Sequence, residues 1–183
     1  MKPLKFTILD TNKKDEIANF ERTLFQVFGD DEPEVRKLIR EYDFENKRMR
    51  FKIPYSSLEI CIAKIGNKIT SGVAINYNTD GLFEVEMLGF TIDKKEKGIC
   101  EGLGLFNTQL FMGDLLTAAE FRKYALRQML KKEVTKCYGT CSQDKLRAYK
   151  FLGWKDIDSR VINGIKKYLI VTDVPVVGKE LNL

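Results

Sequence analysis

A tyrosine near the end of an expected helix is the residue of this chain best placed to do chemistry. The run Ala148–Ile157 reads AYKFLGWKDI, in which Tyr149 stands four residues ahead of the pair Gly153 and Trp154. Glycine is common just past a helix C-terminus, so the helix is expected to end there. Two interpretations stay open. The Tyr149 phenol donates a proton at a reaction centre, or its ring only packs on Phe151 or Trp154.

Two carboxylates stand close together in a stretch with strand-like alternation. Leu82–Asp93 reads LFEVEMLGFTID, and Glu84 and Glu86 alternate there with Val85 and Met87. Side chains two residues apart lie on one face of a strand, so the two glutamates are expected side by side. Such a carboxylate either accepts a proton in a reaction or belongs to a solvated strand face.

Histidine is absent, which limits the chemistry open to the chain. Acid–base steps must then use carboxylates, tyrosine, cysteine, lysine or water. The four cysteines are Cys61, Cys100, Cys137 and Cys141, and the spacing of the last two does not suit a zinc site. We predict no metal site and free thiols. Cys100 has no histidine to activate it, so we interpret it as a small loop residue.

The elements that must position these residues follow from the hydrophobic periods. Strands are predicted at residues 5–9, 82–93, 134–141 and 168–174, with a further strand-like segment after Trp154. Helices are predicted at residues 15–28, over about 33–42, from Thr117 and at 144–152. Leu58–Asn78 has two apolar runs around Gly66 and Asn67, which predicts a β-hairpin. This order indicates a mixed α/β (α+β) class built on a mostly antiparallel sheet.

The segment from residue 94 to residue 116 is rich in glycine and has two interpretations. Either a helical piece runs through LFNTQLF and breaks at Gly113, or Leu103–Met112 adds a strand. Gly102 and Gly104 suggest a dinucleotide fingerprint, but Asn107 stands where a third glycine is needed. We therefore reject that fingerprint.

Composition indicates a globular protein of one domain, spanning residues 1–183. Hydrophobic residues make up 44% of the chain and charged residues 31%, and no apolar run is long enough to span a membrane. The first residues do not resemble a signal peptide, so a cytoplasmic location is expected. The net charge of +5 is spread along the chain and weakly favours an anionic ligand. No RNA-binding motif is present, which leaves a nucleic-acid-associated protein as the weakest option.

The element order resembles the GNAT superfamily of N-acyltransferases, which transfer an acyl group from coenzyme A to an amine. Tyr149–Trp154 is similar to the family motif Y-E-K-L-G-F, and the hairpin IGNKITSGVAI is similar to a pair of its strands. The family's pyrophosphate loop reads [Q/R]-x-x-G-x-[G/A]. Lys95–Cys100 keeps one glycine of that loop but has Lys first and Cys last. A second register, Ile99–Gly104, keeps both glycines.

The resemblance implies a role for each candidate residue. Tyr149 would protonate the departing sulfur, and Glu86 would act as the base. The strand carrying Glu86 would diverge from the strand at 134–141 and bind the pantetheine arm. A glycine turn backed by a helix N-terminus would bind the pyrophosphate. The implied cofactor-binding residues are Phe90, Ile92, Lys97, Gly98, Ile99, Cys100, Gly102 and Ser142.

The predicted function is therefore N-acyl transfer from acetyl-CoA or another acyl-CoA to a small-molecule or peptide amine. The amine would attack the thioester directly. The family also suggests a central sheet of six or seven strands, four main helices and a homodimer as an option, with no membrane or nucleic-acid partner. The alternative is a protein of the same fold that binds or regulates without turnover.

Overall fold

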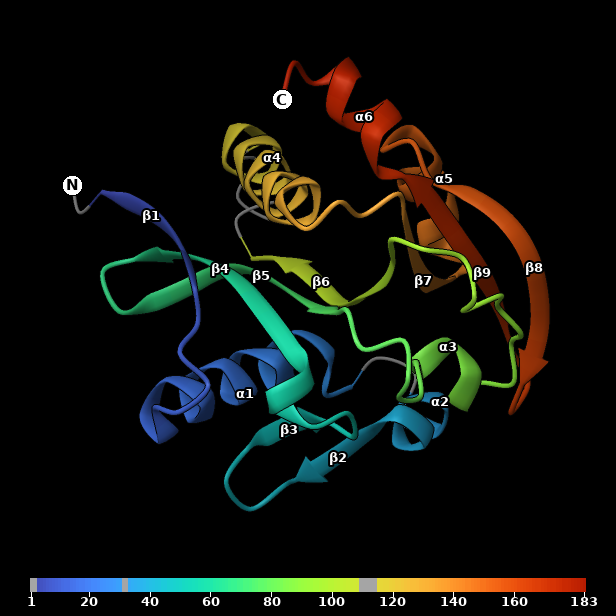
Figure 1. The fold of residues 1–183 in the computed structure, drawn as a ribbon. Coiled ribbons are helices and arrows are strands. Elements are labelled where there is room, and N and C mark those ends of the chain that lie inside the picture. The colour runs from blue at the N-terminus through green and yellow to red at the C-terminus, as the bar shows by residue number, and fades with distance from the viewer. Residues whose placement is uncertain (1–2, 31–32, 109–114) are drawn as a thin grey trace.

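The computed structural model describes residues 3–30, 33–108 and 115–183, and within these residues it has a seven-stranded mixed sheet (Figure 1). In spatial order the strands are β1 (Leu4–Ile8), β4 (Leu58–Ile65), β5 (Lys68–Asn76), β6 (Ile99–Asn107), β7 (Lys136–Ser142), β9 (Ile165–Asp173) and β8 (Lys155–Ile162). Neighbouring strands are antiparallel except β6 and β7, which are parallel. The predicted mixed α/β class with a mostly antiparallel sheet is confirmed.

Helices and a small hairpin cover the sheet on both faces. The helices are α1 (Lys14–Phe28), α2 (Pro33–Ile39), α3 (Glu84–Met87), α4 (Leu115–Lys131), α5 (Gln143–Phe151) and α6 (Val174–Glu180). The hairpin consists of β2 (Arg40–Asp43) and β3 (Arg48–Phe51), and a 3₁₀ turn (Tyr55–Ser57) leads into β4. In Figure 1, α4 and α6 lie on one face, and α1, α2, α3 and the hairpin lie on the other.

Alternation along the central strands divides the core between these two faces. Ile60 and Ile62 of β4 pack toward α1, whereas Cys61 and Ala63 of the same strand pack toward α4. This is the period of two that a strand buried on both faces requires. The strands β7 and β9 are covered in the same way, by α2 and α3 on one face and by α5 on the other. Consequently every central strand carries apolar side chains in both directions.

The predicted hairpin at Leu58–Asn78 is confirmed as β4 and β5, which pair from Leu58↔Asn76 to Ile65↔Lys68. Gly66 in its turn has φ of 62°, a conformation that favours glycine. The helices expected at 15–28, from Thr117 and at 144–152 correspond to α1, α4 and α5. The β2–β3 hairpin and α6 are absent from the sequence-based prediction.

The predicted strand at 82–93 is wrong. Residues 84–87 form the short helix α3, and the chain has no regular structure from there to the turn before Ile99. The carboxylate of Glu86 accepts the backbone N–H of Phe83 at 2.8 Å, which caps the helix at its first residue. Val85 and Leu88 are buried against α2. A run this short satisfies a helical turn as well as an alternating strand, and burial decides between them.

The glycine-rich segment at 94–116 contains a central strand rather than a loop. Ile99–Asn107 forms β6, so the interpretation with an added strand is correct over its first residues. Gly113, where the helical alternative breaks, lies outside the described residues. Among the described helices, none is long and apolar enough to cross a membrane.

Candidate functional site

The parallel strands β6 and β7 separate after three paired positions. The pairs are Ile99↔Lys136, Cys100↔Cys137 and Glu101↔Tyr138, and in the described residues the pairing of these two strands stops there. Both strands continue, β6 to Asn107 and β7 to Ser142. We call the region beyond the last pair the opening, and the end where both strands begin the closed end. Beyond Glu101, β6 therefore has no strand partner on this side in the described residues.

A β-bulge bends β6 inside the opening. Leu103 pairs with Ala74 of β5 and Phe106 pairs with Gly72, so two residues of β6 oppose one residue of β5. The first of these two residues is Gly104, with φ of 56°. A bulge with glycine in this conformation increases the local twist of a strand. The bulge follows directly after the position where the pairing of β6 with β7 stops.

Glycines line the opening on the face covered by α4 and α5. Gly102 of β6 and Gly139 of β7 have no side chain, and the indole of Trp154 lies over both of them. A Cβ atom at Gly139 would lie 3.6 Å from Cζ3 of Trp154, and one at Gly102 would lie 4.0 Å from its Cη2. On this face, the floor of the opening therefore consists of the Trp154 ring and of the two strand positions without side chains that it covers.

Tyr149 stands beside this floor. Its ring meets the Trp154 ring edge-on, with ring centroids 5.7 Å apart. Burial raises the pKa of Tyr149 to about 12, the Cys141 thiol adds to the rise, and the charge of Arg36 opposes it. The phenol is therefore protonated at neutral pH and can donate a proton. The location agrees with the predicted role, and the same contact also fits the packing interpretation.

Three buried charged residues occupy the opposite face where β6 and β7 diverge. Arg40 forms an ion pair with Glu84, and each is 4% exposed. The carboxylate of Glu101, which is fully buried, accepts the backbone N–H groups of Glu84 and Val85, each at 2.8 Å. Burial raises the pKa of Glu101 to about 8, against the effect of the Val85 N–H and of Arg40. We call Arg40, Glu84 and Glu101 the buried charge cluster.

Sequence reasoning missed this cluster. Glu101 fell in the glycine-rich segment, ahead of both structures considered there, and Arg40 fell in a predicted helix. A usable signal was present, because Glu101 is a single charge inside the otherwise uncharged run ICEGLGLFN. A charge in such a run, once the run is read as a buried strand, needs a partner.

Comparisons with known proteins support the fold. No family model matches the sequence, and no curated protein matches it. Solved structures do match. TofI, in a complex with an inhibitor and MTA, has a TM-score of 0.73 and 12% identity, and the match covers 98% of this chain and 96% of that chain. The AHL synthase LasI has a TM-score of 0.75 and 11% identity, over 95% of this chain and 91% of that chain.

A third match links these structures to the family that the sequence resembles. It is an acetyltransferase of the GNAT family from Desulfovibrio desulfuricans, with a TM-score of 0.60 and 10% identity over 94% of this chain and 99% of that chain. The chain has a GNAT-like fold. Identities this low show the shared GNAT-like fold and no more than the fold.

The GNAT-like fold places the predicted site residues in two groups. Gly102 and Ser142 lie at the opening, Gly102 on its floor and Ser142 as the buried last residue of β7. Ile99 and Cys100 are buried in the paired part of β6. Phe90 and Ile92 follow α3 in the core that it shares with α2.

Of the remaining predicted residues, Lys97 and Gly98 lie away from the opening. Gly98, after Lys97, precedes β6 at the closed end, and its carbonyl accepts the backbone N–H of Thr135 at 2.6 Å. This turn leads into a strand, so the expected helix N-terminus behind a phosphate-binding turn is wrong here. Glu86 caps α3 and forms an ion pair with Lys94 at 2.8 Å, so its expected position on a strand is also wrong.

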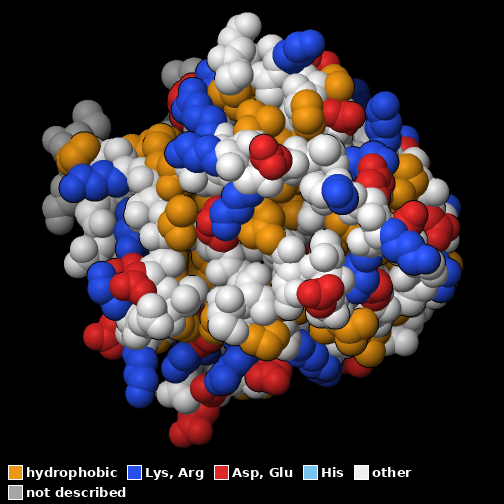
Figure 2. Space-filling model, viewed as in Figure 1, with side chains coloured by type: hydrophobic (Ala, Val, Ile, Leu, Met, Phe, Trp, Pro, Cys, Tyr) orange, Lys and Arg blue, Asp and Glu red, His pale blue; other side chains and the backbone are white. Residues whose placement is uncertain are grey.

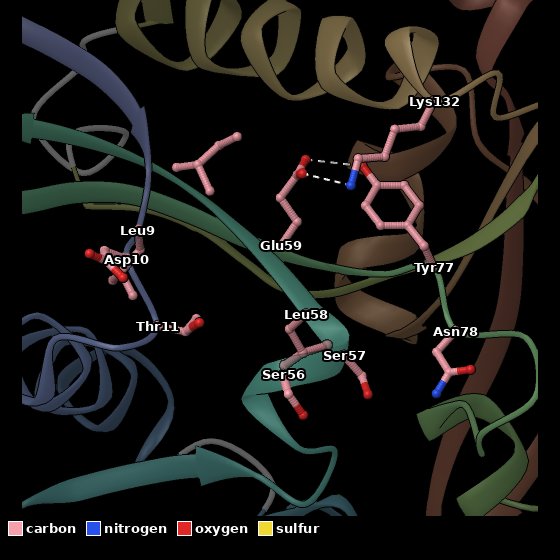
Figure 3. Close-up of a pocket in the computed structure, with 11 residues that line it drawn as sticks. Leu9, Asp10, Thr11, Ser56, Ser57, Leu58, Glu59, Tyr77, Asn78 and Lys132 are labelled. Atoms are coloured by element: carbon pink, nitrogen blue, oxygen red, sulfur yellow. Dashed lines mark hydrogen bonds and ion pairs between the residues drawn. The ribbon is translucent and has the colours of Figure 1, made fainter.

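A cavity of about 610 Å³ lies elsewhere, between the ends of β1 and β5, the start of β4 and the residue that follows α4 (Figure 3). Three of its residues bind one another. Lys132 Nζ lies 2.8 Å from a carboxylate oxygen of Glu59, and the Tyr77 hydroxyl donates to Glu59 at 3.2 Å. Tyr77 comes directly after Asn76, the partner of Glu101 in β5, so this trio lies toward the closed end. Its charges are satisfied without a ligand.

Proposed function

We propose that the protein transfers an acyl group from a coenzyme A thioester to an amine. The observation that supports this most strongly is the divergence of β6 and β7, with unpaired β6 backbone and a floor of two glycines. An extended pantetheine arm carries amide groups, and it would add to β6 as a further strand does. The glycines leave room for it to approach the backbone.

Two groups on opposite faces of the opening support this reaction: Glu101 has a pKa near the operating pH, and Tyr149 holds its proton at neutral pH. An amine arrives as an ammonium ion and must lose a proton before it attacks the thioester carbonyl. Glu101 is the better candidate for this base, because its pKa near 8 is matched to the task, whereas Glu86 is held by Lys94. As the C–N bond forms, the C–S bond breaks, Tyr149 supplies a proton to the sulfur, and the nitrogen releases its second proton to solvent, which leaves a neutral amide. Proton exchange with solvent restores both groups.

The neighbouring structures add support of a coarser kind. BjaI is a CoA-dependent acyl-homoserine lactone synthase, and FeeM is an N-acyl amino acid synthase from uncultured soil microbes. Both names describe acyl transfer. We propose the same class of reaction for this chain and leave the acceptor at the level of an amine.

Binding and turnover of acetyl-CoA test the proposal together. At a hundredfold excess over its dissociation constant, a ligand stabilises the folded state by about 2.7 kcal/mol, so the melting temperature should rise. Turnover is measured as thiol release in the presence of a set of primary amines. A rise in melting temperature with no thiol release for any amine would favour a binding module. No rise with any acyl-CoA would contradict the proposed function.

A further inference from the structure

Trp154 is held in a fixed position at the floor of the opening. Gly153, with φ of 81°, ends α5 and turns the chain back toward the sheet. The backbone N–H of Trp154 then donates to the carbonyl of Tyr149 at 3.1 Å. Arg122 of α4 fixes the same turn by donating to the carbonyl of Leu152 at 2.6 Å. These contacts fix the backbone from which the indole extends over the floor.

The indole fills the space that the two floor glycines leave. It packs against the apolar cluster under α4 and also against the cluster under α5. It lies within 4.0 Å of the Cβ positions of both Gly102 and Gly139, on neighbouring strands. Protein interiors are close-packed, so a second apolar group cannot share this volume.

The two faces of the opening offer an acyl chain very different surroundings. On the face of α2 and α3, the buried charge cluster occupies the point of divergence, with Glu101 fully buried. An apolar chain placed there would separate charges from the groups that stabilise them, which is costly. The face of Trp154 is apolar. An acyl chain that extends from a thioester in the opening therefore has its place on the Trp154 face.

We infer that Trp154 limits the acyl donor to short chains by occupying the volume into which a longer chain would extend. This inference rests on the proposed function and names the class of donor: acetyl and other acyl groups of a few carbons. Removing the indole should convert the floor into an apolar cavity. A cavity of about 150 Å³ with such walls is enough to bind a benzene-sized guest.

The test compares wild type with Trp154→Ala and Trp154→Leu across acetyl-, butanoyl-, hexanoyl- and octanoyl-CoA. Affinity is measured by calorimetry and selectivity as kcat/KM at each chain length. Wild type should lose affinity as the acyl chain lengthens from acetyl to octanoyl. Trp154→Ala should bind longer donors about fourfold more tightly for each methylene that enters the cavity. Trp154→Leu should show a smaller shift in the same direction, and it keeps the test valid if the alanine variant does not fold.

Phe151→Ala is the matched control, because it removes an aromatic ring from the end of the same helix where that ring is 90% exposed. Its chain-length profile should equal that of wild type. The inference is overturned if wild type already prefers octanoyl-CoA, or if the profile of folded Trp154 variants does not change. Failure of the proposed function looks different, since wild type would then bind none of the four donors, and the inference would fall with it.

Discussion

The two ends of the β6–β7 pair carry similar residue types in very different surroundings. Toward the closed end, Glu59 and Lys132 form an ion pair whose side chains are 15% and 48% exposed. At the point of divergence, Arg40 and Glu84 form an ion pair whose side chains are only 3% and 5% exposed, next to the fully buried Glu101. Water screens the first pair, whereas the second must be stabilised by its protein partners. The difference shows that burial, rather than residue type, distinguishes the candidate site at the point of divergence.

Charge on the molecular surface supports the same distinction. Figure 2 shows Lys and Arg side chains interspersed with Asp and Glu across the face that it displays, without one block of either sign. The net charge of +5 is therefore diffuse on this face and does not mark a site. What marks a site is the set of charges that the fold removes from water.

The two ends also each contain a half-buried tyrosine, Tyr149 and Tyr77, which allows a matched pair of variants. Tyr149→Phe should lower turnover roughly 10²- to 10⁴-fold with little change in KM for acyl-CoA, because it removes a general acid and keeps the ring. Tyr77→Phe should leave turnover unchanged, because its hydroxyl serves only Glu59. Steady-state kinetics of thiol release measures the turnover of both variants and of wild type. Equal turnover in wild type and Tyr149→Phe would leave Tyr149 with a packing role alone.

Breaking the ion pair at each end should lower the free energy of unfolding by different amounts in the two regions. Arg40→Met leaves the Glu84 carboxylate buried without its partner, which should lower the free energy of unfolding by about 3–5 kcal/mol. The measurement is urea denaturation followed by circular dichroism. A loss below about 1 kcal/mol for Arg40→Met would mean that water reaches the cluster, and the contrast between the ends would disappear.

Glu101 should make stability depend on pH. Its pKa is about 8 in the folded protein against an ordinary value of 4.5, so between these values the folded state holds a proton that the unfolded state has released. The free energy of unfolding should therefore fall as pH rises from about 4.5 to 8, by about 5 kcal/mol. Glu101→Gln should remove this part of the slope. If the wild-type and variant curves run parallel, the pKa of Glu101 is not raised.

The same ionisation should appear in turnover. If Glu101 is the base, kcat/KM should rise with pH up to about 8, and Glu101→Gln should lose that rise along with most of the activity. Glu86→Gln is the comparison, because Glu86 is held by Lys94 at 2.8 Å and its charge raises the pKa of Glu101, so this variant should keep the activity and shift the rise to lower pH. A pH profile that is unchanged in Glu101→Gln would reject Glu101 as the base.

The smallest effect is expected toward the closed end. Lys132→Met removes the partner of Glu59 from a half-exposed pair, so the free energy of unfolding should change by no more than about 1 kcal/mol. The change should shrink further in 1 M salt, which screens exposed charges. Urea denaturation at low and high salt measures it. A loss as large as that of Arg40→Met would show that exposure does not separate the two pairs.

The sequence by itself determined the elements whose signals are local. The hairpin of β4 and β5 follows from two apolar runs around Gly66, and α5 with Tyr149 near its end follows from a helical period closed by Gly153. Each signal lies within about twenty residues, and the turn residues restrict the backbone directly. The fold class could be predicted from the order of such elements.

Only the tertiary structure decided where the chemistry lies. Glu84 belongs to a helix rather than a strand, and its partner Arg40 is 44 residues away in the chain. Glu101 is a strand residue because β5 and β7 flank the glycine-rich segment, which has no strong local preference of its own. A short run fits both the helical and the strand period, so long-range burial selects between the two structures. A charge removed from water also needs a partner, and that partner can stand anywhere in the sequence.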